Sequence, residues 1–229
     1  PEKLNKPAGR VMLNVDNICC VSKSQFGTSL TNVTFDLRQG EILGIGGVAG
    51  NGQDELFAVL SGEQFSQHGS ISFNGINITK FNPNQRRKIG LLSAPEERLG
   101  HAAAPNMSLI ENTLITAENS QNLVSRGFID WKKSKAFAEK VIKKFDVRTP
   151  GSQNTAGSLS GGNLQKFVIG REILQNPSVF IVNQPTWGVD AAAASSIRQA
   201  LLTLSENGAA ILVISQDLDE LLEISDQFA

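Results

Sequence analysis

The fold is decided by Leu159-Ser160-Gly161-Gly162-Asn163, a stretch in the last third of the chain. A helix-patterned run, residues 164–174, follows it directly, and the apolar segment 179–182 comes next. A serine and two glycines at a helix start bring together one hydroxyl and several backbone N–H groups that have no intrahelical acceptor. The stretch is therefore a candidate phosphate-binding site. The alternative is a helix N-cap with glycines for a tight turn.

The composition is that of an ordinary globular protein. Apolar residues make up 40% of the 229 residues and charged residues 19%, which allows one or two domains with a sizeable core. The formal net charge of −1 argues against nucleic-acid binding, which usually requires a basic excess. No apolar run approaches the ~20 residues that cross a bilayer, and residues 1–10 do not resemble a secretory signal. The adjacent Cys19 and Cys20 favour a reduced pair over a disulfide or a metal site.

Strands alternate with helices along most of the chain, and this order predicts a parallel α/β core. Apolar and β-branched runs predict strands over residues 14–21, 32–37, 41–46, 70–73, 76–79, 89–92, 179–182 and 211–215. Helical periodicity predicts helices over residues 54–60, 164–174, 191–205 and 218–223. Asn74-Gly75 predicts a two-residue hairpin turn.

Residues 105–157 differ from the rest, because helices joined by polar loops replace the alternation. Asp130 can cap a helix on which Phe137, Val141 and Phe145 recur at i, i+4 and i+8. Six lysines occupy the other faces of this helix. A solvated face is the simplest interpretation of the lysines, and a partner-docking face is the alternative.

The glycine-rich loop at residues 47–52, between a predicted strand and a predicted helix, has the layout of a P-loop. The loop and the following two residues read Gly47-Val48-Ala49-Gly50-Asn51-Gly52-Gln53-Asp54. Together with this loop, the pentapeptide at 159–163 resembles the signature motif of ABC-type ATPases, with asparagine at its last position. The resemblance implies an α/β, ABC-type P-loop NTPase fold with a parallel-sheet core, an antiparallel β subdomain and a helical subdomain at about residues 105–157. It also implies a single nucleotide-binding domain over residues 1–229.

The P-loop departs from the family where charge matters most. Gln53 replaces the lysine that reaches the β- and γ-phosphates, and Asp54 replaces the serine or threonine that binds magnesium. A charge pair at ~4 Å is worth about 4 kcal/mol at an effective dielectric of about 20, so losing the lysine forfeits an attraction of that order. Asp54 adds a repulsion and occupies the positive end of the helix dipole. We expect a retained structural turn, with weak nucleotide binding as the alternative.

Amides also replace the other charged groups that the resemblance implies. Residues 179–186 resemble the Walker B strand, where Asn183 replaces a magnesium-binding aspartate and Gln184 replaces the glutamate that polarises the attacking water. Gln216 replaces the switch histidine. An amide cannot accept a proton, and a general base typically contributes ~10²- to 10⁴-fold. Together with Gln53 at the lysine position, these substitutions at the aspartate/glutamate and histidine positions predict an inactive catalytic site on an intact scaffold.

Other family positions follow from order and spacing. Residues 187–190 occupy the D-loop position, which includes Asp190, and residues 94–98 lie where the Q-loop belongs. The resemblance assigns Glu96, Glu97 and Arg98 to a groove that couples to a permease. Phe26 stands near the place of the aromatic that stacks on adenine, although a core role is equally consistent.

Taken jointly, the motifs resemble the second half of the tandem ATPases that serve simple-sugar and nucleoside importers. The matching segments are residues 47–53, 95–98, 159–163 and 183–186. We expect this chain to be part of a longer protein whose first half keeps its P-loop and general base. Ser160 and the N–H groups of Gly161 and Gly162, flanked by Leu159 and Asn163, would then bind the γ-phosphate of the partner's ATP.

The implied cofactors are ATP and Mg²⁺, mainly at the partner half's site. The implied partners are a second nucleotide-binding half, transmembrane permease subunits and, indirectly, a solute-binding protein, on the cytoplasmic side of the membrane. Two alternatives remain: a soluble ABC protein that acts on ribosomes or DNA, and a non-hydrolysing scaffold domain. The chain has no basic surplus and no zinc-type cysteine pairs, which argues against the first. The intact signature argues against the second.

Overall fold

The computed structural model describes residues 9–23 and 27–229, so Phe26 lies outside the described residues. The chain divides into two compact units. One comprises residues 1–93, 177–184 and 201–229, and the other comprises residues 94–176 and 185–200. Over the described ranges, no helix combines the length and apolar character needed to cross a bilayer.

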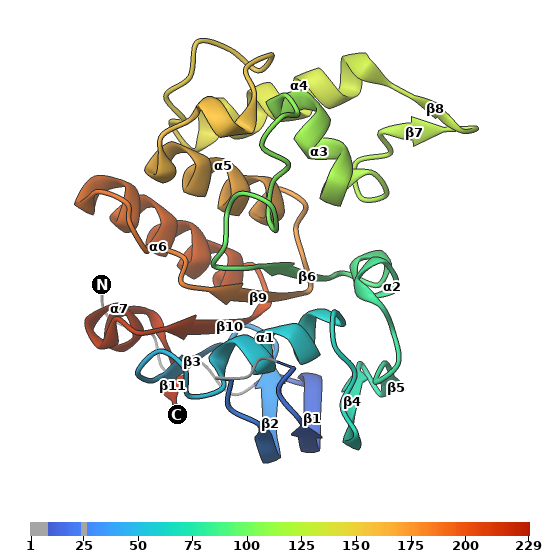
Figure 1. The fold of residues 1–229 in the computed structure, drawn as a ribbon, viewed down its shortest axis with the longest axis vertical. Coiled ribbons are helices and arrows are strands. Elements are labelled where there is room, and N and C mark those ends of the chain that lie inside the picture. Colours follow the sequence, from blue (N-terminus) through green and yellow to red (C-terminus); the bar gives the residue numbers. More distant parts are fainter. Residues whose placement is uncertain (1–8, 24–26) are drawn as a thin grey trace. The chain divides into compact units, whose positions relative to one another are not determined.

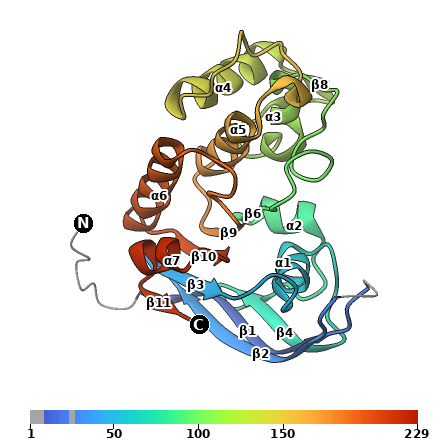
Figure 2. The same cartoon turned by 60° about the vertical axis from the view of Figure 1, so that its left-hand side comes forward.

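The first unit contains two sheets, visible in Figures 1 and 2. The antiparallel sheet has the order β2-β1-β4-β5, and the parallel sheet has the order β11-β3-β10-β9-β6. The antiparallel strands are β1 (Val11–Cys20), β2 (Leu30–Arg38), β4 (His68–Phe73) and β5 (Ile76–Asn77). The parallel strands are β3 (Ile42–Gly46), β6 (Leu91–Ala94), β9 (Val179–Asn183), β10 (Ala210–Ser215) and β11 (Gln227–Phe228). The predicted α/β fold class, with an antiparallel subdomain, is confirmed.

Helix α1 (Gln53–Ser61) shares one apolar core with both sheets. Its Leu56 and Phe57 are buried together with Ile71 of β4 and Leu212 of β10. Strands β9 and β10 are buried along their whole length, which explains their unbroken apolar sequences. Because β3, β9 and β10 run parallel and in register, their carboxyl ends meet at one edge of the sheet. That edge also carries the glycine-rich loop and the start of α1.

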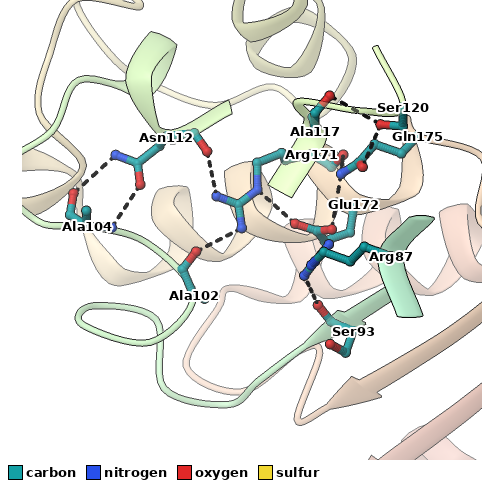
Figure 3. Close-up of polar contacts among 10 residues, drawn as sticks. All are labelled: Arg87, Ser93, Ala102, Ala104, Asn112, Ala117, Ser120, Arg171, Glu172 and Gln175. Atoms are coloured by element: carbon teal, nitrogen blue, oxygen red, sulfur yellow. Dashed lines mark hydrogen bonds and ion pairs between the residues drawn. The ribbon is translucent and has the colours of Figure 1, made fainter. Parts of the chain in front are cut away.

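The predicted strand at residues 89–92 is displaced, since β6 begins only at Leu91. A short helix, α2 (Pro83–Lys88), precedes it and was not predicted. Asn82 caps α2 reciprocally with Gln85, which is a capping box, and this local signal outweighs the apolar pattern. Arg87 then ties α2 to β6 by donating to the Ser93 carbonyl at 3.0 Å (Figure 3).

The hairpin turn at Asn74-Gly75 is confirmed. The two residues have φ of 48° and 79°, both in the left-handed region that a type I′ turn requires. The following strand is shorter than the predicted range 76–79 and ends at Asn77, after which the Thr79 hydroxyl accepts from the Ile71 N–H at 2.8 Å.

The second unit is mainly helical. Its helices are α3 (Leu109–Ala117), α4 (Trp131–Lys144), the 3₁₀ turn η1 (Ala156–Ser158) and α5 (Gly161–Ile173), with a small hairpin of β7 (Val124–Ser125) and β8 (Phe128–Ile129). Asp130 caps α4 by accepting from the Lys133 N–H at 3.0 Å, as predicted. Helix α5 packs against α3 and α4, so this unit is wider than the predicted helical region 105–157. Helix α6 (Ala191–Glu206) begins in this unit, and α7 (Leu218–Ile224) belongs to the first.

A buried ionic network joins α3 and α5 within the second unit (Figure 3). Arg171 is 1% exposed and Glu172 is fully buried. The Arg171 guanidinium donates to Glu172 Oε1 at 2.8 Å and to the carbonyls of Asn112 and Ala102 at 3.0 and 2.8 Å. Glu172 also accepts from Gln175 at 3.1 Å. A buried charge is tolerated only with such compensation.

We therefore expect Arg171→Met to lower the free energy of unfolding by about 3–5 kcal/mol, because it leaves the Glu172 carboxylate without its guanidinium in the interior. Urea denaturation measures this loss. The double variant Arg171→Met/Glu172→Leu should lose clearly less, since neither charge of the pair remains in the interior. Lys135→Met, which removes an exposed pair with Glu139, is the control and should cost under about 1 kcal/mol. Equal losses for Arg171→Met and the control would contradict the prediction.

Candidate phosphate-binding sites

The side chain of Gln53 occupies the glycine-rich loop at residues 47–52. The Gln53 carboxamide folds back over the loop: its Oε1 accepts from the Asn51 N–H at 2.9 Å, and its Nε2 donates to the Val48 carbonyl at 3.0 Å. The amide passes so close to Gly47 that a Cβ there would lie 2.7 Å from Nε2. A phosphate-binding loop needs N–H groups that point at an empty cradle. Here a neutral amide fills the cradle.

The second substituted position forms a direct contact at the same sheet edge. Asn183, at the end of β9, is 3% exposed, and its Nδ2 donates to Asp54 Oδ1 at 3.1 Å. These two residues stand where the resemblance implies a hydroxyl and a carboxylate that share a magnesium ion. The carboxylate therefore stands at the start of α1 and the neutral amide at the end of β9, the reverse of the implied arrangement, and a hydrogen bond joins them. Asn183 Oδ1 has no hydrogen-bond partner among the described residues.

Gln184 and Gln216 also meet at this edge. The backbone N–H of Gln216 donates to Gln184 Oε1 at 3.3 Å, and Gln184 has a left-handed φ of 53°. Next to them, the Ser215 hydroxyl donates to Glu220 Oε2 at 2.8 Å. The Gln184 oxygen thus accepts from the backbone, and neither glutamine offers a group that can take up a proton at neutral pH.

The signature stretch lies in the second unit, at the start of α5. Ser160 is the N-cap residue of α5, yet its side chain makes no capping hydrogen bond. Asn163 Oδ1 accepts from the Arg148 N–H at 2.8 Å, which fixes the orientation of the amide because a backbone N–H can only donate. Asn163 Nδ2 must then donate to Ser160 Oγ, 2.9 Å away. The Ser160 hydroxyl hydrogen is consequently free to point at an incoming acceptor.

A cavity of about 270 Å³ opens beside Ser160. Its lining comes from the end of α4, the start of α5 and the start of α6: Phe145, Asp146, Arg148, Ser160, Gly162, Asn163, Lys166, Asp190, Ala192, Ala193 and Ser196. Two cationic side chains, Arg148 and Lys166, and the N–H end of a 13-residue helix line this cavity, and all three favour an anion.

Two carboxylates balance these cations. Lys166 lies 3.8 Å from Asp146 Oδ2 and also donates to the Asp146 carbonyl. Asp190 caps α6, accepting from the Ala193 N–H at 2.9 Å. That hydrogen bond is the main cause that holds the pKa of Asp190 below its usual value, and the charges of Lys166 and Arg148 act in the same direction. Asp190 therefore stays ionised at neutral pH.

Arg98 links three segments of the second unit that are distant in sequence. Its Nε donates to Gln165 Oε1 of α5 at 2.9 Å, and its Nη2 donates to the Trp187 carbonyl. Gln165 in turn donates to the Pro185 carbonyl at 2.9 Å. The guanidinium passes so close to Gly161 that a Cβ there would lie 2.8 Å from Nη1. The loop at 94–98, the signature helix and the segment 185–190 thus share one hydrogen-bonded group.

Residues 30–187 match the family model described as ABC transporter. The chain belongs to the ABC transporter family. This match covers more than half of the 229 residues and includes both the glycine-rich loop and the signature stretch.

Several import ATP-binding proteins are similar to this ABC cassette. An arabinose import ATP-binding protein of Vibrio parahaemolyticus is 40% identical over 88% of this chain. A glucose import ATP-binding protein of Haloferax volcanii is 37% identical over 87% of the chain, and a nucleoside import ATP-binding protein of Lactococcus lactis is 36% identical over 91%. The chain spans only 36–41% of the length of these three relatives.

Solved structures agree on the fold. A dimeric ATP-binding cassette in a post-hydrolysis state, bound to ADP and Pi, superposes with a TM-score of 0.79 at 20% identity, covering 95% of this chain and 93% of that one. A nucleotide-free ATP-binding cassette superposes with a TM-score of 0.74 at 23% identity, covering 96% and 87%. At these identities the likeness establishes the ABC ATPase cassette fold.

The structure groups the predicted ABC positions into two sets. Gln53, Asp54, Asn183, Gln184 and Gln216 gather at one sheet edge of the first unit. Ser160, Gly162, Asn163 and Asp190 line the cavity of the second unit, and Arg98 contacts the signature helix. The cavity residues Arg148 and Lys166 were not predicted. Lys166 follows Asn163 by three residues, which is a helical-face signal, whereas no local pattern marks Arg148.

The groups at Asp54 do not suit the Mg²⁺ ion that the resemblance implies. Magnesium requires oxygen ligands in octahedral geometry, and Asn183 presents its NH₂ group to the only carboxylate of the pair. Within residues 9–23 and 27–229, no three His, Cys, Asp or Glu side chains gather in a way that could hold a metal. The signature cavity, by contrast, suits a phosphate oxygen through Ser160 and the N-terminus of α5.

Proposed function

We propose that this chain is the catalytically silent nucleotide-binding half of a tandem importer ATPase, and that its signature motif binds the γ-phosphate of ATP held by a second cassette. One contrast carries the proposal: the chain's own glycine-rich loop is filled by Gln53, whereas Ser160 and the start of α5 face an open cavity with cationic walls.

The silent site follows from three contacts. The Gln53 amide takes the Asn51 N–H that a phosphate would need. The Asp54–Asn183 hydrogen bond occupies the metal position and leaves a negative charge at the start of α1, where it repels a triphosphate. Gln184 replaces the general base with a group that takes up no proton. Each change alone weakens turnover, and together they remove it.

The signature motif presents hydrogen-bond donors that are already oriented toward a phosphate oxygen. Asn163 holds the Ser160 oxygen as an acceptor, so the hydroxyl hydrogen can be donated to a phosphate oxygen. Preorganised donors of this kind act where charge develops in the transition state and typically contribute ~10²- to 10³-fold each. Asp190 borders the same cavity, so a nucleotide bound there would also lie next to the D-loop.

Arg98 provides a route from the permease to the signature. Movement of the segment that contains Glu96 and Glu97 would be transmitted through the Arg98 guanidinium to Gln165 in α5 and to the Trp187 carbonyl. Trp187 is 59% exposed, which suits a residue that a second cassette covers. Closure of the two cassettes around ATP, followed by hydrolysis on the partner half, would then drive the permease.

The transported class rests on the relatives' names. The similar proteins are named as importing arabinose, glucose and nucleosides. We extend this class to the present chain: a simple sugar or nucleoside, passed from a solute-binding protein to a permease, with the chain held at the cytoplasmic face. ATP and Mg²⁺ would bind mainly on the partner cassette.

The 229-residue chain alone should therefore hydrolyse Mg-ATP no faster than a buffer blank, as measured by phosphate release. Gly50→Asp, which places a carboxylate in the glycine-rich loop, should change nothing. Turnover comparable to a working ABC ATPase, abolished by Gly50→Asp, would refute the silent-site proposal.

A further inference from the structure

We propose that a basic and aromatic surface on the second unit docks onto the headgroups of an anionic lipid bilayer. We call it the hairpin patch, and it consists of Arg126, Phe128, Ile129, Trp131, Lys132 and Lys133. The patch contributes nothing to either phosphate-binding site, so this inference goes beyond the proposed nucleotide chemistry.

The backbone places the patch at the end of a projecting element. Strands β7 and β8 form a hairpin with a two-residue turn, and the hairpin extends away from the helices of the second unit (Figure 1). The turn residues Arg126 and Gly127 have φ of 52° and 83°, the left-handed pair of a type I′ turn. Arg126 is one of the few residues other than glycine that adopt a left-handed φ among the described residues. Strand β8 leads through Asp130 directly into α4, which brings Trp131 beside the hairpin.

The hairpin patch exposes three large apolar side chains within four residues. Phe128 is 80% exposed, Trp131 is 52% exposed and Ile129 is 40% exposed. The chain has only two tryptophans, and one of them lies here. Clustered exposed apolar side chains mark interaction sites, and tryptophan is favoured at the boundary between lipid and water.

The charge around these aromatics is strongly positive. Residues 126–144 contain seven basic and two acidic side chains, a net charge of +5 in a chain whose total is −1. Both acids are engaged locally: Asp130 lies 3.7 Å from Lys133, and Glu139 lies 3.7 Å from Lys135. Across the described part of the chain, no ion pair involves Arg126 or Lys132. The surplus matches the negative potential of anionic headgroups.

A bilayer fits these features better than an acidic protein does. A lipid surface needs no shape complementarity, and the patch combines a projecting hairpin with the first turn of α4. Aromatic side chains at such a tip can enter between headgroups while adjacent lysines remain at the phosphate level. An acidic protein segment would instead rely on the charges, with little need for Phe128 and Trp131.

Vesicle co-sedimentation of the 229-residue chain tests the proposal. We expect binding to vesicles of phosphatidylglycerol and phosphatidylcholine at equal amounts, and little binding to pure phosphatidylcholine. Lys132→Gln/Lys133→Gln should weaken binding about 25-fold, because each basic residue near an anionic surface contributes about fivefold. The matched control is Lys143→Gln/Lys144→Gln, which removes the same charge at the other end of α4 and should weaken binding less than about threefold.

The apolar test variant is Phe128→Ser/Trp131→Ser, which should reduce binding at least about tenfold. Circular dichroism should show that the variant remains folded, since both side chains are more than half exposed. In a Trp187→Phe background, Trp131 is the only tryptophan, and its emission should shift to shorter wavelength on vesicles with phosphatidylglycerol.

Three results would overturn the proposal: no binding to anionic vesicles, equal losses in the two lysine pairs, or an unshifted Trp131 emission in the bound state. Retention on polyglutamate that is unaffected by Phe128→Ser/Trp131→Ser, without vesicle binding, would assign the patch to an acidic protein segment. None of these measurements involves ATP, so their outcome is independent of the silent-site proposal.

Discussion

Ser160→Arg should abolish ATP turnover in the complete two-cassette protein, although the half that carries Ser160 is itself catalytically silent. The substitution removes the hydroxyl donor and fills the cavity between α5 and α6 with a long side chain. Loss of one preorganised oxyanion donor typically costs ~10²- to 10³-fold in rate, and the blocked cavity adds to that loss. Steady-state phosphate release from the reconstituted importer measures the effect, with solute uptake into proteoliposomes as the second readout.

The matched control is Ser158→Arg, two residues earlier in the 3₁₀ turn. Ser158 is exposed and donates only to the Thr155 carbonyl, and it does not line the cavity. It should keep turnover within about twofold of the parent. Transport that survives Ser160→Arg would show that the signature of this half does not complete the partner's ATP site.

The variant Asn163→Asp tests whether the orientation of the Ser160 hydroxyl matters for turnover. The new carboxylate has the same shape and still accepts from the Arg148 N–H, but it must also accept from Ser160 and so turns the hydroxyl away from a phosphate. We expect turnover to fall about 10²-fold, while Asn163→Gln, which keeps a donating amide, retains more activity. Equal activity of the two variants would contradict the orientation argument.

Reversing the substitutions at Gln53, Asp54 and Asn183, next to the glycine-rich loop, should create nucleotide binding in the isolated chain. The triple variant Gln53→Lys/Asp54→Ser/Asn183→Asp removes the amide that fills the loop and returns the carboxylate to β9. A lysine–phosphate pair at ~4 Å contributes about 4 kcal/mol at an effective dielectric of about 20, which is a change of about 10³-fold in affinity. Isothermal titration with Mg-ATP measures this gain.

Gln153→Lys is the control, because it adds the same charge at an exposed position in the other unit and should leave binding undetectable. The triple variant should still not hydrolyse ATP, since Gln184 and Gln216 remain amides. Failure of the triple variant to bind, with its fold intact, would mean that something other than these three side chains excludes nucleotide. Tight binding of Mg-ATP by the unmodified chain would also contradict the prediction, because its filled loop should exclude nucleotide.

The architecture was largely predictable because its signals are local. The unbroken apolar runs of β9 and β10, the Asn74-Gly75 turn and the Asp130 cap each depend on neighbouring residues, and each appears in the structure. The errors have local causes as well. The capping box at Asn82 shifted β6, and the short β7–β8 hairpin carries too few residues to show strand periodicity.

The sequence by itself determined the family resemblance, the order of strands and helices, and the replacement of charged groups by amides at Gln53, Asn183 and Gln216. These follow from residue identity and spacing alone. Only the tertiary structure decided which groups meet. Asp54 and Asn183 are 129 positions apart, and Arg98 reaches Gln165 across 67. Such contacts depend on how strands align and which rotamers fit, and these are properties of the packed chain rather than of any local segment.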